Sequence, residues 1–252
     1  MRKFLLINLK INKNYRDVLN LNPKFLWFIA LTYSMLSLLS NWFSICTVSL
    51  RETPINAGIL IYPITFLLSN FIAEIYGYKY ARRAIWYGLL FNVLSILYGL
   101  WVIYLPSPNY AVHNSLFDSV ITTYLKSVYI FVISYFIAEP FNIFFLAKLK
   151  LSMNGYYMKL RLVISTILSM TITGIIFNFI ASYDKLINIK LMPTIFMATM
   201  TIMLAFPILS YLIEKIKQFE EIDIYDQNTQ FNFFKFEVKY RDENNEFNKL
   251  AD

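Results

Sequence analysis

Cysteine and histidine are almost absent from this chain of 252 residues, which contains one of each, Cys46 and His113. A single cysteine excludes an intramolecular disulfide framework and a cysteine-based zinc site. A single histidine leaves a metal-dependent hydrolase with very few imidazole ligands. The sequence also contains no Walker motif, so we expect that the chain does not hydrolyse nucleotides itself. We therefore predict no metal site, no cofactor and no catalytic residues.

Charged residues are also scarce. They make up 15% of the chain, whereas a soluble domain normally carries about 25%. Hydrophobic residues make up 58%. The formal net charge is +7, but the basic residues are scattered between long apolar runs and do not line one surface. This pattern argues against nucleic acid as a partner. It favours the lipid bilayer as the surroundings of this chain.

Six stretches are long and apolar enough to cross a bilayer, which takes about 20 mainly apolar residues in a helix. They are residues 25–50, 57–78, 84–105, 127–147, 162–183 and 191–213. Four of them carry no charge, and the second and fourth each carry one glutamate, Glu74 and Glu139. We therefore predict an all-α integral membrane protein with six transmembrane helices.

Lysine and arginine gather in alternate loops. Lys79, Arg82 and Arg83 follow the second span, and further basic residues precede the first span and follow the fourth. Cytoplasmic loops carry an excess of lysine and arginine, so we predict that both termini are cytoplasmic. The acid-rich C-terminal end has the composition of a partly disordered tail. The predicted division of the chain is a cytoplasmic N-terminal segment (1–24), a six-helix transmembrane domain (25–213) and a cytoplasmic polar tail (214–252).

The tetrapeptide FIAE occurs twice, at 71–74 and 136–139, and each copy places its glutamate inside an apolar span. A charged residue at the bilayer centre costs at least about 2.5 kcal/mol, so such residues usually face a cavity or a partner. Glu139 lies near the middle of its span. Glu74 lies closer to the predicted cytoplasmic end, where it could reach the interface and pair with Lys79 or Arg82. The structural alternative for Glu139 is an interhelical hydrogen bond.

Polar residues accompany both glutamates at helical spacing. Asn70 lies four residues before Glu74, and Asn142 lies three residues after Glu139, so each pair shares a helix face. The fifth span carries Ser169 and Thr173 on one face, a pattern that close helix packing also explains. We predict a polar cavity for a small ligand rich in hydrogen-bond donors. Its candidate residues are Glu139, Asn142, Glu74, Asn70, Ser169 and Thr173, with Lys79, Arg82 and Arg83 in gating or topology.

Two other classes of function remain open from the residues alone. An intramembrane enzyme needs a nucleophile or metal with positioned partners. His113 lies in a predicted outer loop away from both glutamates, and no spacing motif marks a serine nucleophile. A purely structural or assembly role in the membrane is the other alternative. We predict that the protein is not an enzyme.

Three stretches carry a resemblance to a known family. Residues 62–86 read YPITFLLSNFIAEIYGYKYARRAIW, and residues 138–150 read AEPFNIFFLAKLK. The third is the RxxxST pattern of Arg161, Ser165 and Thr166, which opens the fifth span. In this order and spacing they resemble the queuosine precursor transporter family, which is grouped with the vitamin uptake transporters.

The resemblance implies a six-helix importer in the bacterial cytoplasmic (inner) membrane. Its substrates would be purine-like 7-deazaguanines, namely the 7-cyano and 7-aminomethyl forms or queuine, salvaged for queuosine in tRNA. A carboxylate suits such a ligand, because the guanine edge presents two parallel donors that one carboxylate can accept. We favour Glu139 for the substrate and Glu74 for gating or coupling. Tyr78, Trp86 and Phe141 are candidates to stack on the ring.

The sequence leaves the source of energy open. The chain could be a facilitator or a proton-coupled carrier. It could also be the substrate-binding subunit of a vitamin uptake system driven by a separate ATPase partner.

Overall fold

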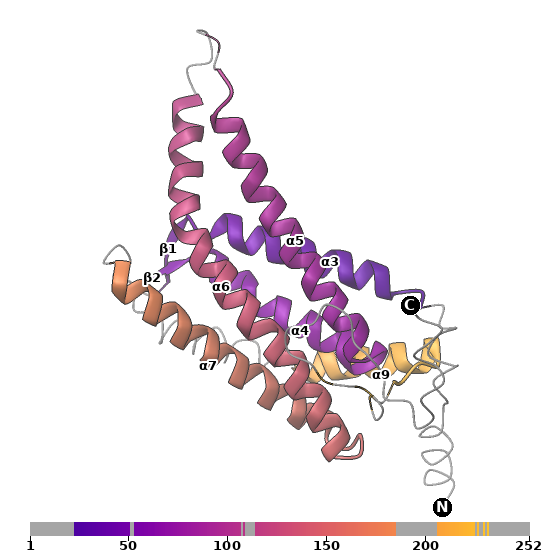
Figure 1. The fold of residues 1–252 in the computed structure, drawn as a ribbon. Coiled ribbons are helices and arrows are strands. Elements are labelled where there is room, and N and C mark those ends of the chain that lie inside the picture. The colour runs from indigo at the N-terminus through magenta and orange to yellow at the C-terminus, as the bar shows by residue number, and fades with distance from the viewer. Residues whose placement is uncertain are drawn as a thin grey trace, which may run out of the picture.

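The computed structural model describes residues 23–50, 53–106, 108, 114–184, 206–224, 226, 229 and 231. These residues form a bundle of helices with one small hairpin (Figure 1). The elements are α3 (Leu26–Phe43), β1 (Thr47–Leu50), β2 (Thr53–Asn56), α4 (Gly58–Tyr76), α5 (Tyr78–Ile103), α6 (Asn114–Ser152), α7 (Met158–Asp184) and α9 (Phe206–Glu220).

Helix α4 lies at the centre of the bundle and contacts α3, α5, α6, α7 and α9. Its second half is buried on every side, from Ser69 to Tyr76. A helix that is apolar all round belongs in a core, and α4 follows this rule except for its few polar side chains. Those polar side chains, which include Asn70 and Glu74, therefore have to find partners on the surrounding helices.

Large apolar side chains cover the outside of the bundle. Trp27 and Phe28 on α3, Trp101 on α5 and Phe179 on α7 are all more than half exposed. Such a surface suits lipid better than water. Within the described residues, four segments are long and apolar enough to cross a membrane: Leu26–Phe43, Tyr78–Ile103, Phe131–Ser152 and Met158–Ile176. The structure therefore supports an all-helical multi-pass membrane protein.

The structure supports the remaining two predicted spans, the second and the sixth, less fully. Helix α4 matches the second span but has a shorter apolar stretch, Leu60–Tyr76. Of the sixth span, 191–213, only the end is described, as the first half of α9. The six-span count and the cytoplasmic side of the termini therefore stay predictions.

The first predicted span, 25–50, was too long. Helix α3 ends at Phe43, and the chain then forms the antiparallel hairpin β1–β2, in which Val48 pairs with Ile55 and Ser49 with Pro54. Thr47 and Val48 are β-branched and favour an extended strand over a helix. Helix α6, in contrast, begins at Asn114, well before the predicted start of its span. The end of α5 and the start of α6 project beyond the rest of the bundle (Figure 1).

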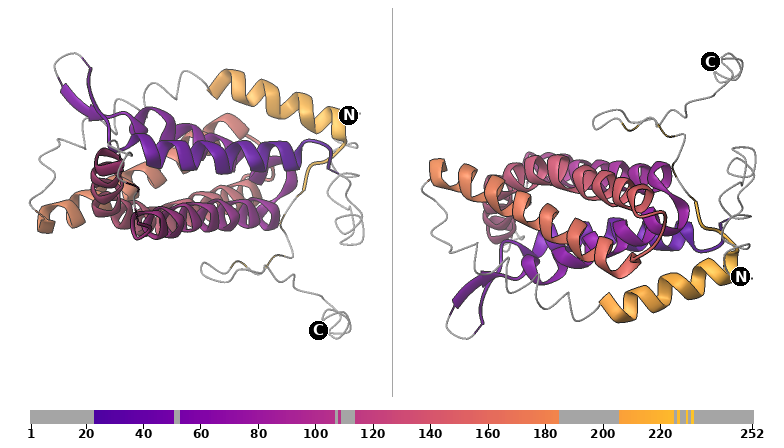
Figure 2. Two further views of the ribbon diagram at one scale, coloured as in Figure 1. Left: turned by 90° about the horizontal axis from the view of Figure 1, so that it is seen from above. Right: turned by 90° about the horizontal axis from the view of Figure 1, so that it is seen from below.

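Helix α9 continues to Glu220, so the predicted boundary at 213 falls inside a helix. It lies along the edge of the bundle in both views of Figure 2. Its end lies beside the start of α3, where the Phe25 N–H donates to Glu220 Oε1 over 2.8 Å. The chain then turns at Glu221 (φ 54°), and the Ile224 N–H donates to the Ile75 carbonyl of α4. Part of the predicted tail therefore packs on the bundle.

Candidate functional site

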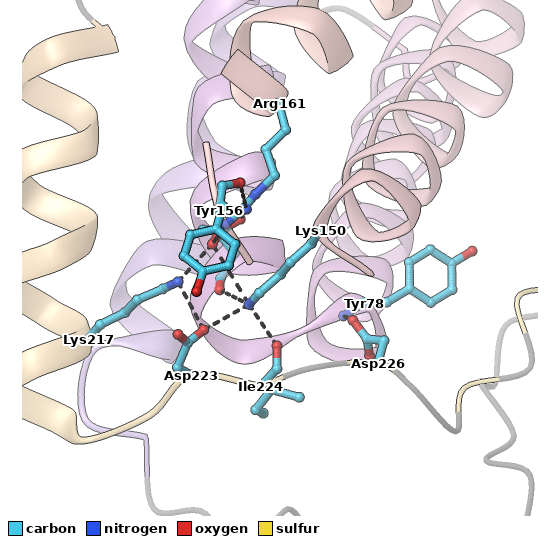
Figure 3. Close-up of polar contacts among 9 residues, drawn as sticks. Tyr78, Lys150, Tyr156, Arg161, Lys217, Asp223, Ile224 and Asp226 are labelled. Atoms are coloured by element: carbon cyan, nitrogen blue, oxygen red, sulfur yellow. Dashed lines mark hydrogen bonds and ion pairs between the residues drawn. The ribbon is translucent and has the colours of Figure 1, made fainter. Parts of the chain in front are cut away.

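Glu74 is fully buried and pairs with cations from three other helices. Figure 3 shows these cations, Arg161, Lys150 and Lys217, pointing toward one another. Arg161 of α7 donates to both carboxylate oxygens, from Nη2 to Oε1 and from Nε to Oε2 over 3.1 Å. Lys217 Nζ of α9 donates to Oε1 over 2.7 Å, and Lys150 Nζ of α6 lies 3.8 Å from the same oxygen. The bidentate geometry with arginine is a strong form of ion pair. Every oxygen of this carboxylate is therefore occupied.

Asp223 adds a second carboxylate to the same cluster. Its Oδ1 accepts hydrogen bonds from Lys150 (2.8 Å) and Lys217 (2.9 Å). Lys150 also donates to the carbonyls of Glu74 and Ile224, each over 2.7 Å. Burial alone would raise the pKa of Asp223, but the charges of Lys150 and Lys217 outweigh it and hold the pKa below its usual value. Three cations and two carboxylates thus join α4, α6, α7, α9 and the segment after α9.

Asp226 fixes the same segment to the start of α5. Its Oδ2 accepts the Tyr78 N–H over 3.0 Å, and its Oδ1 accepts the Thr229 hydroxyl over 3.2 Å. A carboxylate at this position satisfies an N–H that the helix leaves unpaired. Burial raises the pKa of Asp226. Gly77 (φ 85°) makes the turn, and a Cβ there would lie 2.9 Å from Ile224 Cγ2, so this close approach needs glycine.

Glu139 is also fully buried, but no cation pairs with it among the described residues. The hydroxyls of Thr65, Ser69 and Tyr33 lie beside it. Each has another acceptor: Thr65 donates to the Tyr62 carbonyl (2.6 Å), and Ser69 donates to the Phe66 carbonyl (3.1 Å). Thr65 Oγ1 also lies 3.1 Å from Glu139 Oε1, so its one proton is shared between two acceptors.

The third hydroxyl beside Glu139, that of Tyr33, also donates to another acceptor. Tyr33 and Tyr135 are hydrogen-bonded through their hydroxyls, and the Tyr135 hydroxyl donates to the Ile85 carbonyl over 2.9 Å. Because Tyr135 has one proton, Tyr33 is the donor in the pair. Glu139 Oε2 accordingly has no hydrogen-bond partner in the described part of the chain. A buried acceptor without a donor is costly and calls for an explanation.

A chain of side-chain amides runs next to Glu139. Asn142 Nδ2 donates to Ser69 Oγ (3.2 Å) and to Asn70 Oδ1 (2.8 Å). Asn70 Nδ2 in turn donates to Thr166 Oγ1 over 2.8 Å. All of these side chains are buried. The Asn142 carbonyl Oδ1 is left without a hydrogen-bond donor from any described residue.

Aromatic rings adjoin this polar group. Tyr62 packs edge-on against Phe66 and Phe131, and Phe131 also contacts Tyr135. The Tyr62 hydroxyl is buried and, within the residues described, has no partner in hydrogen-bond geometry. Thr173 lies near it but donates its own proton to the Ser169 carbonyl. We call Glu139, Asn142, Tyr62 and the side chains that bond to them the Glu139 site.

The structure brings some predicted residues together and separates others. Asn70 joins Asn142 and the Glu139 site, although it lies on the same helix face as Glu74. Ser169 and Thr173 are buried, and both hydroxyls donate to carbonyls of their own helix, over 2.8 and 2.9 Å. This bonding fits the packing interpretation of that stripe.

The sequence suggested Lys79 or Arg82 as the ion-pair partner of Glu74, but the structure pairs Glu74 with other cations. Arg82 is buried and donates to the Tyr78 hydroxyl over 2.6 Å, with its guanidinium near the Trp86 ring. Lys79 and Arg83 are half-buried in the first turns of α5. The stacking candidates make ring contacts elsewhere: Trp86 with Phe136, and Phe141 with Phe145.

Several members of the Glu139 site and of the ion-pair cluster around Glu74 were not identified from the sequence. Tyr62, Thr65 and Ser69 recur at three- and four-residue steps on α4, and this spacing was the available signal. Lys150 and Arg161 lie in the stretches that carry the family resemblance, but no local pattern indicates that they are partners of Glu74. No local sequence pattern indicates that Lys217 and Asp223 belong to the cluster, because both residues lie beyond the last predicted span. The described residues contain no group of three or more metal-ligating side chains.

A family described as "Putative vitamin uptake transporter" matches residues 56–212, which is more than half of the chain. The chain belongs to the vitamin uptake transporter family. The queuosine precursor transporters fall within this family, so the resemblance found in the sequence is confirmed. Comparisons with curated proteins and with solved structures find no match.

Membership in the vitamin uptake transporter family supports membrane transport of a small molecule. The matched region contains Glu74, Glu139, Asn142 and Arg161, whereas Lys217 and Asp223 lie beyond its end at residue 212. The bonded members of the Glu139 site thus lie within the matched family region, whereas the neighbouring Tyr33 precedes it. The ion-pair cluster combines residues of that region with residues outside it.

Proposed function

We propose that this vitamin uptake transporter imports queuosine precursors, the 7-deazaguanines, across the cytoplasmic membrane of a bacterium for tRNA queuosine salvage. The observation that carries the proposal is the pair of buried acceptors on α6, Glu139 Oε2 and Asn142 Oδ1, which no described residue supplies with a donor. The two residues are three positions apart and therefore lie on one helix face.

The guanine edge complements the unpaired groups of the Glu139 site. It offers the N1–H and the exocyclic amino group as donors and a carbonyl as acceptor. Glu139 and Asn142 supply two acceptors, and the Tyr62 hydroxyl supplies a donor. Phe66 and Phe131, which pack around Tyr62, offer apolar faces for the ring.

Selectivity follows from the same groups. An adenine-like base presents an acceptor where guanine presents its N1–H, so the carboxylate would face another acceptor. Sites built to bond a donor reject analogues that lack it, because the buried partner is left unpaired. We therefore expect guanine-like bases to compete for uptake and adenine-like bases not to compete.

In this proposal the Glu74 cluster is the inner gate. It joins four helices and the segment after α9 at one end of the bundle through saturated ion pairs. Both oxygens of Glu74 are bonded within this cluster, so neither is left for a substrate. Its partial opening would release the substrate toward the cytoplasm.

The test is rescue of queuosine-modified tRNA in a precursor-auxotrophic bacterial strain that lacks its own importer. The parental protein should restore the modification when a 7-deazaguanine is supplied, and Glu139→Gln should not. Glu214→Gln is the matched control, because Glu214 is exposed on α9 and the same chemical change is made. No rescue by the parental protein, at verified membrane levels, would refute the proposal.

The same strain separates the modes of energy coupling. Rescue in a host without vitamin-uptake ATPase modules would favour a facilitator or a proton-coupled carrier. Rescue that requires such a module would favour a substrate-binding subunit. Recovery of the labelled substrate unchanged after uptake would agree with transport without catalysis, whereas a converted product would indicate an intramembrane enzyme.

A further inference from the structure

The amide chain beside Glu139 is anchored at both ends. At one end, Ser69 donates its only hydroxyl proton to the Phe66 carbonyl over 3.1 Å, so towards Asn142 its Oγ can act only as an acceptor. Asn142 must therefore turn its NH2 group toward Ser69. At the other end, Thr166 Oγ1 accepts from Asn70 Nδ2 over 2.8 Å.

The acceptor-only Ser69 sets the direction of both amides. Asn142 presents the second hydrogen of its Nδ2 to Asn70 Oδ1, so the NH2 group of Asn70 faces Thr166, whose Oγ1 accepts it. Both hydrogens of the Asn142 amide are then used within the protein. Its carbonyl oxygen remains, buried and without a donor from the described chain, one helical turn from Glu139.

We propose that Ser69 and Thr166 are specificity-determining positioning residues. They hold Asn142, directly and through Asn70, with its carbonyl oxygen toward the ligand, so that the Glu139 site presents two acceptors. The ligand class that this arrangement selects is a fused purine-like ring with an exocyclic amino group beside a ring N–H. The inference rests on the proposed function and names the feature of the substrate that the site reads.

The experiment compares uptake of two analogues that differ in one group. One is a 7-deazaguanine, and the other is the 7-deazahypoxanthine with the same 7-substituent, which lacks the exocyclic amino group. The parental protein should prefer the amino analogue by at least about tenfold, because the other analogue leaves a buried acceptor unpaired. The quantity measured is the ratio of initial uptake rates at equal protein in the membrane.

Two substitutions release the two anchors. Ser69→Ala removes the hydroxyl that fixes Asn142, and Thr166→Val removes the acceptor of Asn70 at nearly constant volume. Each should lower the ratio about threefold, and the double variant about tenfold, because the Asn142 amide can then turn its NH2 group toward the ligand. Thr166→Ser keeps the hydroxyl and should keep the ratio. Thr171→Val is the matched control, since Thr171 is exposed on the same helix.

The outcomes separate positioning from a merely structural role. A structural role would lower uptake of both analogues equally and leave the ratio unchanged, and that result overturns the inference. Where the double variant does not reach the membrane, each single variant carries the same test. If the parental protein transports the 7-deazaguanine but the ratio stays constant in all variants, this inference fails and the proposed function stands. If the parental protein transports neither analogue, both fail.

Discussion

Glu74 and Glu139 end the same tetrapeptide, FIAE, and both are fully buried, yet their surroundings are opposite. Glu74 is held by Arg161, Lys150 and Lys217, and both of its oxygens are bonded. Glu139 has hydroxyls and amides around it, and no described residue donates to its Oε2. The difference shows that sequence identity over four residues does not fix the partners of a buried carboxylate.

The energetic consequences differ as well. Removing one partner of a buried ion pair leaves uncompensated charge and costs about 3–5 kcal/mol. Removing a carboxylate that has no cation and one unbonded oxygen relieves a cost in the empty protein, and in the proposed function it withdraws an acceptor from the ligand. These differences support the proposal in which Glu74 serves assembly and gating and Glu139 serves recognition.

The largest expected effect is that of Glu74→Gln on stability. The substitution leaves Arg161, Lys150 and Lys217 around a neutral side chain, and we expect a loss of about 3–5 kcal/mol in the free energy of unfolding. Thermal unfolding of the purified protein in detergent measures this loss. A melting temperature equal to that of the parental protein would remove the distinction between the two glutamates.

Glu139→Gln should show the reverse pattern. Uptake of the 7-deazaguanine should fall about 10- to 100-fold, because charged hydrogen bonds to the ligand are lost. The free energy of unfolding should change by less than about 1 kcal/mol, since no cation is left unpaired. Uptake and unfolding are measured on the same preparation. A variant that unfolds easily but transports normally when folded would assign Glu139 to structure instead.

Asp223→Asn tests the ion-pair cluster around Glu74, and its effect on stability should depend on pH. The pKa of Asp223 lies below its usual value, so its ionised form stabilises the fold above the unfolded-state pKa of about 4. This stabilisation is lost as the pH falls through the lowered pKa. We expect the variant to be less stable than the parental protein at pH 7 and equally stable well below pH 4, in unfolding measurements in detergent. A stability difference that persists unchanged into acid would contradict the role of its charge.

The smallest effect is expected for Ser169→Ala. Its hydroxyl donates to the Ser165 carbonyl on the same helix, so its removal leaves no partner on another helix unpaired. Uptake should change less than about twofold, and the free energy of unfolding by less than about 1 kcal/mol. A loss of uptake comparable to that of Glu139→Gln would place Ser169 at the ligand after all.

Local sequence patterns predicted a large share of the site. Glu139 and Asn142 share a helix face because residues three apart lie together on any α-helix. The same rule places Asn70 on the face of Glu74 but does not give its partners: from its place on α4, Asn70 bonds to Asn142 of α6 and Thr166 of α7. Which helix an exposed face meets depends on how the helices are rotated and packed, and a single helix sequence does not contain that information.

By itself, the sequence determined the membrane character of this protein, most of its helices and the presence of two carboxylates inside them, because length, hydropathy and helical spacing are local properties. Only the tertiary structure decided their partners. Lys217 reaches Glu74 from 143 residues further along the chain, and Asp223 joins from beyond the last predicted span. Buried charges need partners wherever packing can bring them. The fold, and not the tetrapeptide, therefore gave one glutamate three cations and left the other with an oxygen that no described residue bonds.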